Sequence, residues 1–212
     1  MKWAKPQVMG SVPPARVGHT TINVGRYLYA YGGIDHRMEE AIDDLAVLDT
    51  KDNNWSNFKF GGLRPAGRIG HASTLCGRTM LVFGGYYDDS YNNDLWVLDT
   101  QQMKWMSPAT QGTPPAPRVG HSLVAAPGDT RTILFGGSAV GSAFNDVWVL
   151  DNIDWTWVQV LFSVSLFLSL SLFLSLSLSF FLSSTLTSRR HRWTTTEWRP
   201  CSSVDALLYT TL

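Results

Sequence analysis

Short apolar runs recur along the first three quarters of the chain, and clusters of Gly, Asn, Asp and Pro separate them. β-Branched and aromatic residues dominate these runs, which is typical of β-strands. No stretch of residues 1–157 carries a helical period. The pattern therefore predicts an all-β structure, with strands at Thr20–Val24, Tyr27–Tyr31, Leu45–Leu48, Met80–Phe83, Leu95–Leu98, Thr132–Phe135 and Val147–Leu150.

Four sequence markers recur in step about every 50 residues. Arg-x-Gly-His comes first in each unit, followed by Gly-Gly, then Leu-Asp, and then a Trp six residues after that Asp. The marker residues with an expected structural role are Arg16, Gly18, His19, Gly32, Gly33 and Trp55 in the first unit, Arg68, Gly70, His71, Gly84, Gly85 and Trp105 in the second, and Arg118, Gly120, His121, Gly136, Gly137 and Trp157 in the third.

Each unit holds four predicted strands, the last of which carries the Trp. Four strands at this interval are the signature of a β-propeller blade. One blade cannot bury both faces of its sheet, so neighbouring blades must stack. The paired glycines are expected where positive φ or a close backbone approach is needed. The Trp is expected to be an apolar plate between blades.

The combined motif resembles the kelch repeat. It reads Pro-x-x-Arg-x-Gly-His, then Leu-Tyr-Ala-Tyr-Gly-Gly or Leu-Val-Phe-Gly-Gly, then Asn-Asp-Leu-Trp-Val-Leu-Asp and a spaced Trp. The first unit departs from it, with Asp43-Asp44-Leu45-Ala46 in place of Asn-Asp-Leu-Trp. The resemblance implies a propeller, commonly of six or seven blades, that serves protein–protein interaction.

The repeats are expected to occupy residues 1–160, with units at about 13–62, 63–112 and 113–160. Residues 1–12 match the Trp step of a unit and are expected to be the final strand of a preceding or closing blade. Because propellers need 4–8 blades, three blades predict a partial ring. The fold class is all-β: a partial kelch-type β-propeller of about three four-stranded blades plus an N-terminal strand, followed by a non-propeller low-complexity tail.

The repeat register fails after Trp157. Residues 161–184 are nine Leu, nine Ser, five Phe and one Val, and no charge occurs between Trp155 and Ser188. We assign 161–188 as a low-complexity apolar segment and 189–212 as an unassigned tail that is expected to be disordered.

Three interpretations of the apolar segment stay open. A transmembrane helix near 158–186 would be flanked by the basic residues 189–192. A single amphipathic strand fits the alternation of Leu and Ser but is far longer than ordinary strands. The third is a translated non-coding tract, such as a retained intron, because a CT repeat encodes alternating Leu and Ser. We favour the third.

Composition narrows the classes of function. The chain has 212 residues, with 17 basic and 17 acidic side chains, so it lacks the positive footprint of a nucleic-acid-binding protein. Its two cysteines have no metal-site spacing. The N-terminus has no secretory signal peptide. We expect a cytoplasmic protein with no cofactor and no nucleic-acid partner, and a membrane association only if 158–186 is a genuine span.

The recurrent histidines and arginines are expected to be structural. Metal ligands must converge on one ion, whereas blade symmetry separates equivalent side chains around a ring. The recurring arginines suit a buried fork that binds carboxylate or carbonyl oxygens, and the Asp of each Leu-Asp is one candidate partner.

Catalytic and calcium motifs find no support. The run from Asp88 to Asp94 alternates like a calcium loop, but Asn93 stands where such a loop needs Gly, which favours an ordinary turn. The chain also has no nucleophile elbow, phosphate loop or His-Glu-x-x-His. A non-enzymatic protein is expected.

The loops that vary between units are the predicted binding surface. In an up-and-down blade, the connections at 34–43, 86–93 and 138–145 share one end with the Pro-rich links around 6–15, 59–67 and 108–117. We predict a scaffold or adaptor module that binds a protein or peptide, with a membrane-anchored kelch protein as the alternative. The candidate partner-binding residues are His36, Arg37, Glu39, Glu40, Tyr86, Tyr87, Asp88, Asp89, Tyr91 and Phe144.

Overall fold

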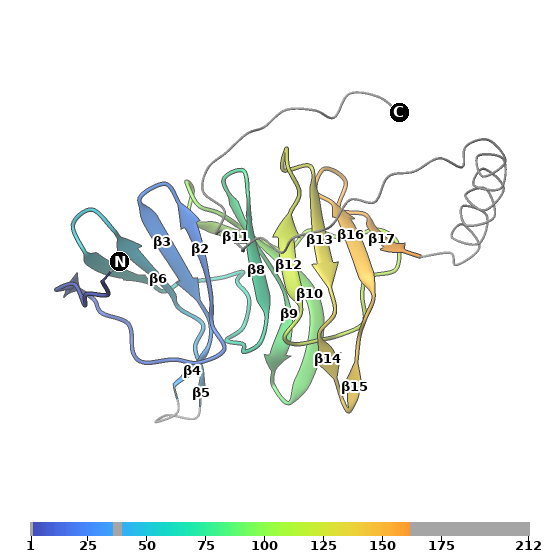
Figure 1. Ribbon diagram of the computed structural model, residues 1–212, viewed down its shortest axis with the longest axis horizontal. Coiled ribbons are helices and arrows are strands. Elements are labelled where there is room, and N and C mark those ends of the chain that lie inside the picture. The colour runs from blue at the N-terminus through green and yellow to red at the C-terminus, as the bar shows by residue number, and fades with distance from the viewer. Residues whose placement is uncertain (1, 36–39, 162–212) are drawn as a thin grey trace, which may run out of the picture. The chain divides into compact units, whose positions relative to one another are not determined.

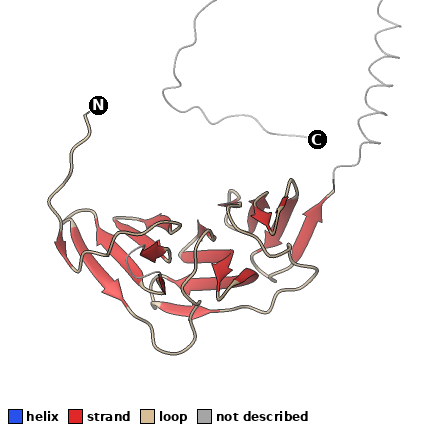
Figure 2. Ribbon diagram, turned by 90° about the horizontal axis from the view of Figure 1, so that it is seen from below, coloured by secondary structure: helices blue, strands red, loops and turns tan. Residues whose placement is uncertain are grey.

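The computed structural model describes residues 2–35 and 40–161, and these are strands, turns and links (Figures 1 and 2). Three sheets of four or five strands stand side by side in chain order, and within the described ranges no residue is helical. The all-β fold class and the partial propeller are therefore confirmed. Among these residues there is also no helix long and apolar enough to cross a membrane.

Blade 1 is a five-stranded sheet in the order β1-β7-β6-β3-β2. Its strands are β1 (Met9–Gly10), β2 (Thr20–Val24), β3 (Tyr27–Tyr31), β6 (Leu45–Asp49) and β7 (Asn54–Phe58). The strands β2, β3, β6 and β7 form the expected antiparallel meander. By contrast, β1 pairs with β7 in parallel, so the link that enters the blade adds a short edge strand to it.

Blade 2 is a four-stranded sheet in the order β11-β10-β9-β8. It contains β8 (Ala72–Cys76), β9 (Thr79–Tyr87), β10 (Ser90–Asp99) and β11 (Lys104–Met106). The strands β9 and β10 run on through the Gly-Gly pair into a long hairpin, with an irregularity in register between Asn92 and Leu95.

Blade 3 repeats this sheet in the order β12-β13-β16-β17. It contains β12 (Ser122–Ala125), β13 (Arg131–Phe135), β16 (Val147–Asp151) and β17 (Trp157–Val160). Separate two-stranded hairpins extend the loops of blades 1 and 3, and they are β4 (Ile34–Asp35) with β5 (Glu40–Ala41), and β14 (Ser138–Ala139) with β15 (Ser142–Ala143). All the strands predicted from the apolar runs are confirmed.

The core lies between the blades rather than within them. One buried cluster joins blade 1 to blade 2 and a second joins blade 2 to blade 3. At the first seam the rings of Tyr31 and Trp105 are 5.1 Å apart, and at the second the rings of Phe83 and Trp157 are also 5.1 Å apart. Tilted aromatic pairs at this distance stabilise a contact beyond the burial of their area. The expected role of the spaced Trp between blades is confirmed for these two.

The first glycine of the Gly-Gly pair lies at a seam in blades 1 and 2. Gly32 has a φ of +71°, and a Cβ added there would lie 2.8 Å from the Arg68 carbonyl oxygen of the next blade. Gly84 repeats this, with a φ of +66° and the Arg118 carbonyl oxygen 2.9 Å from such a Cβ. Both reasons expected for the glycine, positive φ and close backbone approach, apply at these positions.

The segments at both ends of the repeats remain predictions in part. Residues 2–8 form no strand, and Trp3 is wholly exposed, so a role in closing another blade is not tested. The proposed membrane span near 158–186 begins inside β17, since residues 158–160 are strand. Its remainder from 162 onward, and the tail 189–212, lie outside the described residues.

Candidate functional site

The recurring arginines bind carboxylates, but not those of the Leu-Asp pairs. Arg68 is fully buried, and its guanidinium donates to both carboxylate oxygens of Asp94 at 2.7 and 2.9 Å and to the Gly84 carbonyl at 2.9 Å. Arg118 repeats the arrangement with Asp146 and Gly136. Each fork ties a link between blades to the strands of the following blade, which is a structural role.

The prediction that the Leu-Asp carboxylates are the partners is therefore wrong. The bound carboxylate directly precedes the third strand in blades 1 and 3 and lies within β10 in blade 2, whereas the Leu-Asp carboxylate ends the strand in every blade. Five residues of extended chain separate Asp44 from Asp49, about 17 Å. Asp49 instead accepts a hydrogen bond from the Lys51 amide in the turn at the other end of the blade.

Blade 1 compensates for its departure from the motif. In the other blades the Trp two residues after the bound Asp donates its ring N–H to that carboxylate, as Trp96 does to Asp94 at 2.6 Å. Ala46 cannot do so, and the side-chain amide of Asn57 donates to Asp44 at 2.7 Å in its place. Arg16 binds the same carboxylate at 2.8 Å.

Two of the recurring histidines, His71 and His121, lie at the seams. The His71 ring is buried, its Nε2 lies 2.8 Å from the Thr20 hydroxyl of blade 1, and Tyr31 packs against its edge. Burial, and then the charge of Arg68, lower the pKa of His71 to about 3. Burial and Arg118 lower the pKa of His121 to about 4. Both rings are therefore neutral parts of the packing at pH 7.

A central hollow opens where the three Arg-x-Gly-His segments meet. The Gly70 amide donates to the Gly18 carbonyl at 3.0 Å, and the Gly120 amide donates to the Gly70 carbonyl at 2.8 Å. These bonds bring together the apolar residue that precedes each glycine, and these residues surround a hollow of about 570 Å³. Its lining consists of Val17, Gly18, Ile69, Gly70, Tyr86, Asp89, Tyr91, Val119 and Val140.

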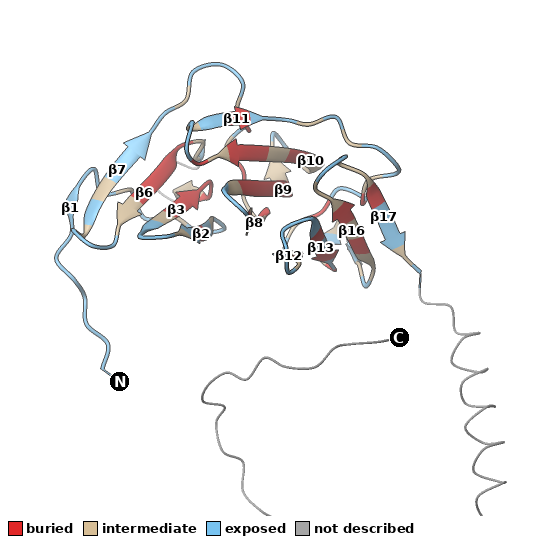
Figure 3. Ribbon diagram, turned by 90° about the horizontal axis from the view of Figure 1, so that it is seen from above, coloured by how far each residue is buried: buried red, intermediate tan, exposed pale blue. Residues whose placement is uncertain are grey.

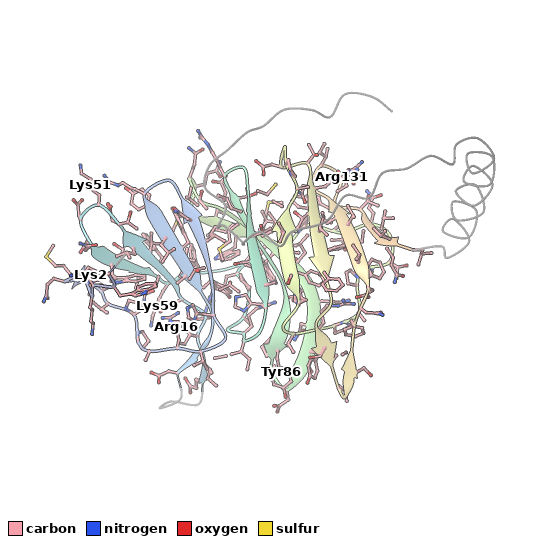
Figure 4. All side chains as sticks on the ribbon, in the orientation of Figure 1. Lys2, Arg16, Lys51, Lys59, Tyr86 and Arg131 are labelled. Atoms are coloured by element: carbon pink, nitrogen blue, oxygen red, sulfur yellow. The ribbon has the colours of Figure 1, made fainter. Side chains whose placement is uncertain are left out.

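One wall of the central hollow comes from the hairpin of β9 and β10. The rings of Tyr86 and Tyr91 meet edge to face at 5.2 Å, and the Tyr86 hydroxyl lies 3.4 Å from the Asp89 carboxylate. Partial burial, and then Asp89, raise the pKa of Tyr86. Asp88 and Asp89 form the exposed tip with positive φ, which these short polar residues tolerate. Figure 4 shows Tyr86 at the end of the blades opposite to Lys51 and Arg131.

Eight of the ten predicted partner-binding residues fall into three groups. Tyr86, Asp89 and Tyr91 line the central hollow, and Asp88 lies beside them. Glu40 lies in β5, exposed, on the hairpin of blade 1. The remaining ones, His36, Arg37 and Glu39, lie outside the described residues.

Tyr87 and Phe144 are engaged within the protein. The Arg68 guanidinium lies 4.8 Å from the centre of the Tyr87 ring, and the Arg118 guanidinium lies 4.1 Å from the centre of the Phe144 ring. Both rings cover the ends of the buried arginine forks, and such contacts stabilise the charge. Their predicted contribution to partner binding is not tested.

The carboxylates of the calcium-like run are not arranged around one point. Asp94 is held by Arg68 and Trp96, whereas Asp88 is at the exposed tip. Across residues 2–35 and 40–161, no three His, Cys, Asp or Glu side chains are grouped so as to hold a metal ion. Cys76 is buried, and its thiol donates to the Asp129 carbonyl of blade 3.

The sequence reasoning missed the floor of the central hollow. Val17, Ile69 and Val119 occupy the variable position of Arg-x-Gly-His, and Val17 is 48% exposed despite its apolar side chain. The available signal was that this position is β-branched and apolar in all three units, although it lies in a link rather than a strand.

The chain matches a family model described as the KLHDC2/KLHL20/DRC7 Kelch-repeats domain over residues 1–167. The chain belongs to the kelch-repeat family. The repeat units, the four-stranded blades and the conserved spacing of their markers agree with this membership. Kelch-repeat domains are generally protein-interaction modules, and the match supports a protein-binding role at that general level.

Several proteins from other organisms are similar to parts of this chain. Human Kelch domain-containing protein 3 is 36% identical over 87 residues, which is 41% of this chain and 23% of that protein. Tip elongation aberrant protein 1 of Schizosaccharomyces pombe is 31% identical over 145 residues, 66% of this chain and 13% of that protein. Host cell factor of Drosophila melanogaster is 37% identical over 91 residues, 40% of this chain and 6% of that protein. The kelch chain thus matches less than a quarter of the length of each relative.

Proposed function

We propose that this kelch domain is a scaffold or adaptor that binds a protein or peptide through the central hollow. The observation that carries the proposal is the hollow itself: apolar side chains from all three repeat units converge beneath a pair of tyrosines. Buried apolar anchors and aromatic rims are the usual centres of binding energy in protein interfaces. An enzyme would need a reactive group here, and the lining offers apolar side chains, tyrosines and one carboxylate.

The chemistry of the rim indicates the kind of partner. Asp88 and Asp89 are exposed beside the hollow, and Glu40 is exposed on the neighbouring blade. A partner segment that places an apolar side chain in the hollow and a Lys or Arg beside these carboxylates would be complementary in shape and charge. The charge contacts would weaken as salt rises, because exposed ion pairs are screened.

A peptide-display selection against the full chain tests the proposal. Peptides recovered with the unmodified protein should bind Val17→Asp at least about tenfold more weakly, because an unpaired charge would then face the apolar partner residue. Val17 is exposed, so the variant should fold. Ile153→Asp is the matched control, since Ile153 is 77% exposed in the turn between β16 and β17, away from the hollow.

Equal binding of the recovered peptides to both variants would refute the central hollow as the site. A selection that recovers no specific peptide would also count against the proposal, provided that the protein is monodisperse. The cytoplasmic location and the alternative membrane anchor remain separate predictions, which fractionation of cells expressing the full chain would test.

A further inference from the structure

Blade 3 presents an apolar sheet face that no described element covers. In each blade one face points to the preceding blade, the N-side face, and one points to the following blade, the C-side face. On the C-side face of blade 3, Val124 and Val158 are each 58% exposed, Phe135 is 52% exposed and Ile133 is 41% exposed. An exposed apolar patch of this kind marks an interaction surface.

The equivalent face of blade 2 is a completed seam. Its Leu81 and Phe83 are fully buried, and Val97 is 2% exposed, because blade 3 covers them. Ile133, Phe135 and Val149 occupy the same positions of blade 3, by their spacing from the Gly-Gly pair and from Leu-Asp. The open face of blade 3 therefore has the composition of a face that receives another blade.

Blade 1 presents the complementary open face. Trp55 on its N-side face is half-buried, whereas the equivalent Trp105 and Trp157 are 2% and 3% exposed. Leu28 and Leu48 on the same face are also half-buried. Figure 3 shows buried residues in the inner strands of all three blades, whereas β1 and most of β7 are exposed at the blade 1 end.

We propose that two copies of this chain close one six-bladed ring, with blade 3 of each copy packed on blade 1 of the other. The argument is continuity with the two seams inside the chain. Each of those seams pairs the aromatic residue before Gly-Gly with the Trp of the next blade. The unmatched members of this series are Phe135 at one end and Trp55 at the other, and a second copy brings them together.

The backbone at each open end continues the same series. Gly33 donates to the Arg68 carbonyl at 2.9 Å and Gly85 donates to the Arg118 carbonyl at 3.0 Å. In the ring, the corresponding hydrogen bond would run from the Gly137 amide of one copy to the Arg16 carbonyl of the other. A hydroxyl–imidazole contact also has its counterpart, since Ser122 and the exposed His19 occupy the positions of Thr20 and His71.

The number of blades favours closure with two copies. Contacts between unlike surfaces generate either closed rings or open filaments, according to the rotation between copies. The three blades formed by the described residues, taken from two copies, give six, within the range of 4–8 in which propellers close. The position before blade 1 is then filled by β17 of the second copy, and the exposed Trp3 remains outside the seam.

The mass of the full chain in solution is the first test. Light scattering coupled to gel filtration should give twice the 23.6 kDa of one chain, with no larger species. Phe135→Asp should weaken association at least tenfold, whereas Ile153→Asp should leave it unchanged, because Ile153 is an apolar residue of the same blade that is even more exposed (77% against 52%) and lies in the turn between β16 and β17. A monomer, or an open-ended series of larger species, overturns the proposal.

Mixing variants separates a closed ring from other dimers. Phe135→Asp and Trp55→Ala damage opposite sides of the seam, so each alone has two defective seams. A mixture of the two contains one intact seam per ring and should regain dimers, whereas a dimer formed by packing the blade 3 faces of both copies together would not need Trp55 and would not be restored in this way.

A photo-reactive benzoylphenylalanine at position 135 identifies what covers the open face. With equal amounts of normal and ¹⁵N-labelled chains, the cross-link should join residue 135 to the β7 region of another chain. A cross-link to residues 162–212 of the same chain would mean that the tail covers blade 3, and it would overturn the proposal.

Discussion

Blades 2 and 3 have nearly the same pattern of residues but very different burial. The C-side face of blade 2 is closed by its neighbour, so Phe83 is fully buried, whereas Phe135 in the same position of blade 3 is 52% exposed. The two strands have equivalent registers with their partners. The difference shows that the apolar pattern of a blade prepares both of its faces for contact with a neighbouring blade, whether or not the described chain provides both neighbours.

Truncating the two equivalent phenylalanines should give the largest contrast. Phe83→Ala should lower the free energy of unfolding by about 3–5 kcal/mol, because it leaves a cavity in a closed seam. Phe135→Ala should cost under about 1 kcal/mol in the isolated chain, since half of the ring is already in water. Urea unfolding measures both.

Protein concentration sharpens this comparison. If copies pair through blade 3, the cost of Phe135→Ala should grow as the protein concentration rises, whereas the cost of Phe83→Ala should grow little. Equal costs for the two variants in dilute solution would contradict the difference in burial.

Removing the partner of a buried arginine should have the next largest effect. Asp94→Ala leaves the Arg68 charge buried, and such a loss costs about 3–5 kcal/mol; we expect the lower end, because the Asp94 side chain is 30% exposed. The matched control is Asp43→Ala, whose pair with Arg64 is 42% and 36% exposed and should contribute under about 1 kcal/mol. Similar losses in thermal unfolding for the two variants would argue against the buried fork as a structural tie.

Acidification should destabilise the closed seams by a smaller amount per residue. The pKa of His71 is lowered to about 3 and that of His121 to about 4, against about 6.5 in the unfolded chain. The unfolded state therefore binds more protons below pH 6.5, and stability is lost as the pH falls. Between pH 6.5 and 5 each histidine should cost about 2 kcal/mol.

Substituting single histidines shows which of them causes the loss of stability at low pH. His71→Gln should remove about half of the difference in unfolding free energy between pH 7 and pH 5. At pH 5 the lowered pKa values of Asp94 and Asp146 leave their carboxylates charged, so the change reports on the histidines. A pH response that His71→Gln does not alter would contradict the burial of this ring.

The fold could be predicted from the sequence because every level of the pattern agrees. Thr20–Val24 and Tyr27–Tyr31 alternate and end at turn residues, and both are strands at those bounds. The partner of the recurring arginines could not be obtained from spacing, since Asp44 and Asp49 stand at opposite ends of the same strand, β6. The choice depends on which end of the strand faces the link, and that is a property of the assembled blade.

The candidate site was predictable only at its rim. Tyr86 and Tyr91 stood out because aromatic residues in a loop have no local reason to be there. Val17 did not, because one apolar residue in a link is an ordinary observation. Its importance arises when Gly18 and Gly70 are bonded and three links meet. Tyr87 was indistinguishable from Tyr86 in sequence, and its contact with Arg68 depends on strand direction.

Because hydrogen bonds join Gly18, Gly70 and Gly120, the same short link of each repeat contributes to the structure in two ways. The backbone joins one blade to the next, and the neighbouring apolar side chain forms part of the floor of the central hollow. Adding or deleting a repeat would therefore widen or narrow the central hollow, while the kind of side chain that lines it stayed the same. Exchanging one valine or isoleucine would alter the side chains that line the hollow without changing its width. The width of the hollow and its selectivity for a partner can therefore evolve independently.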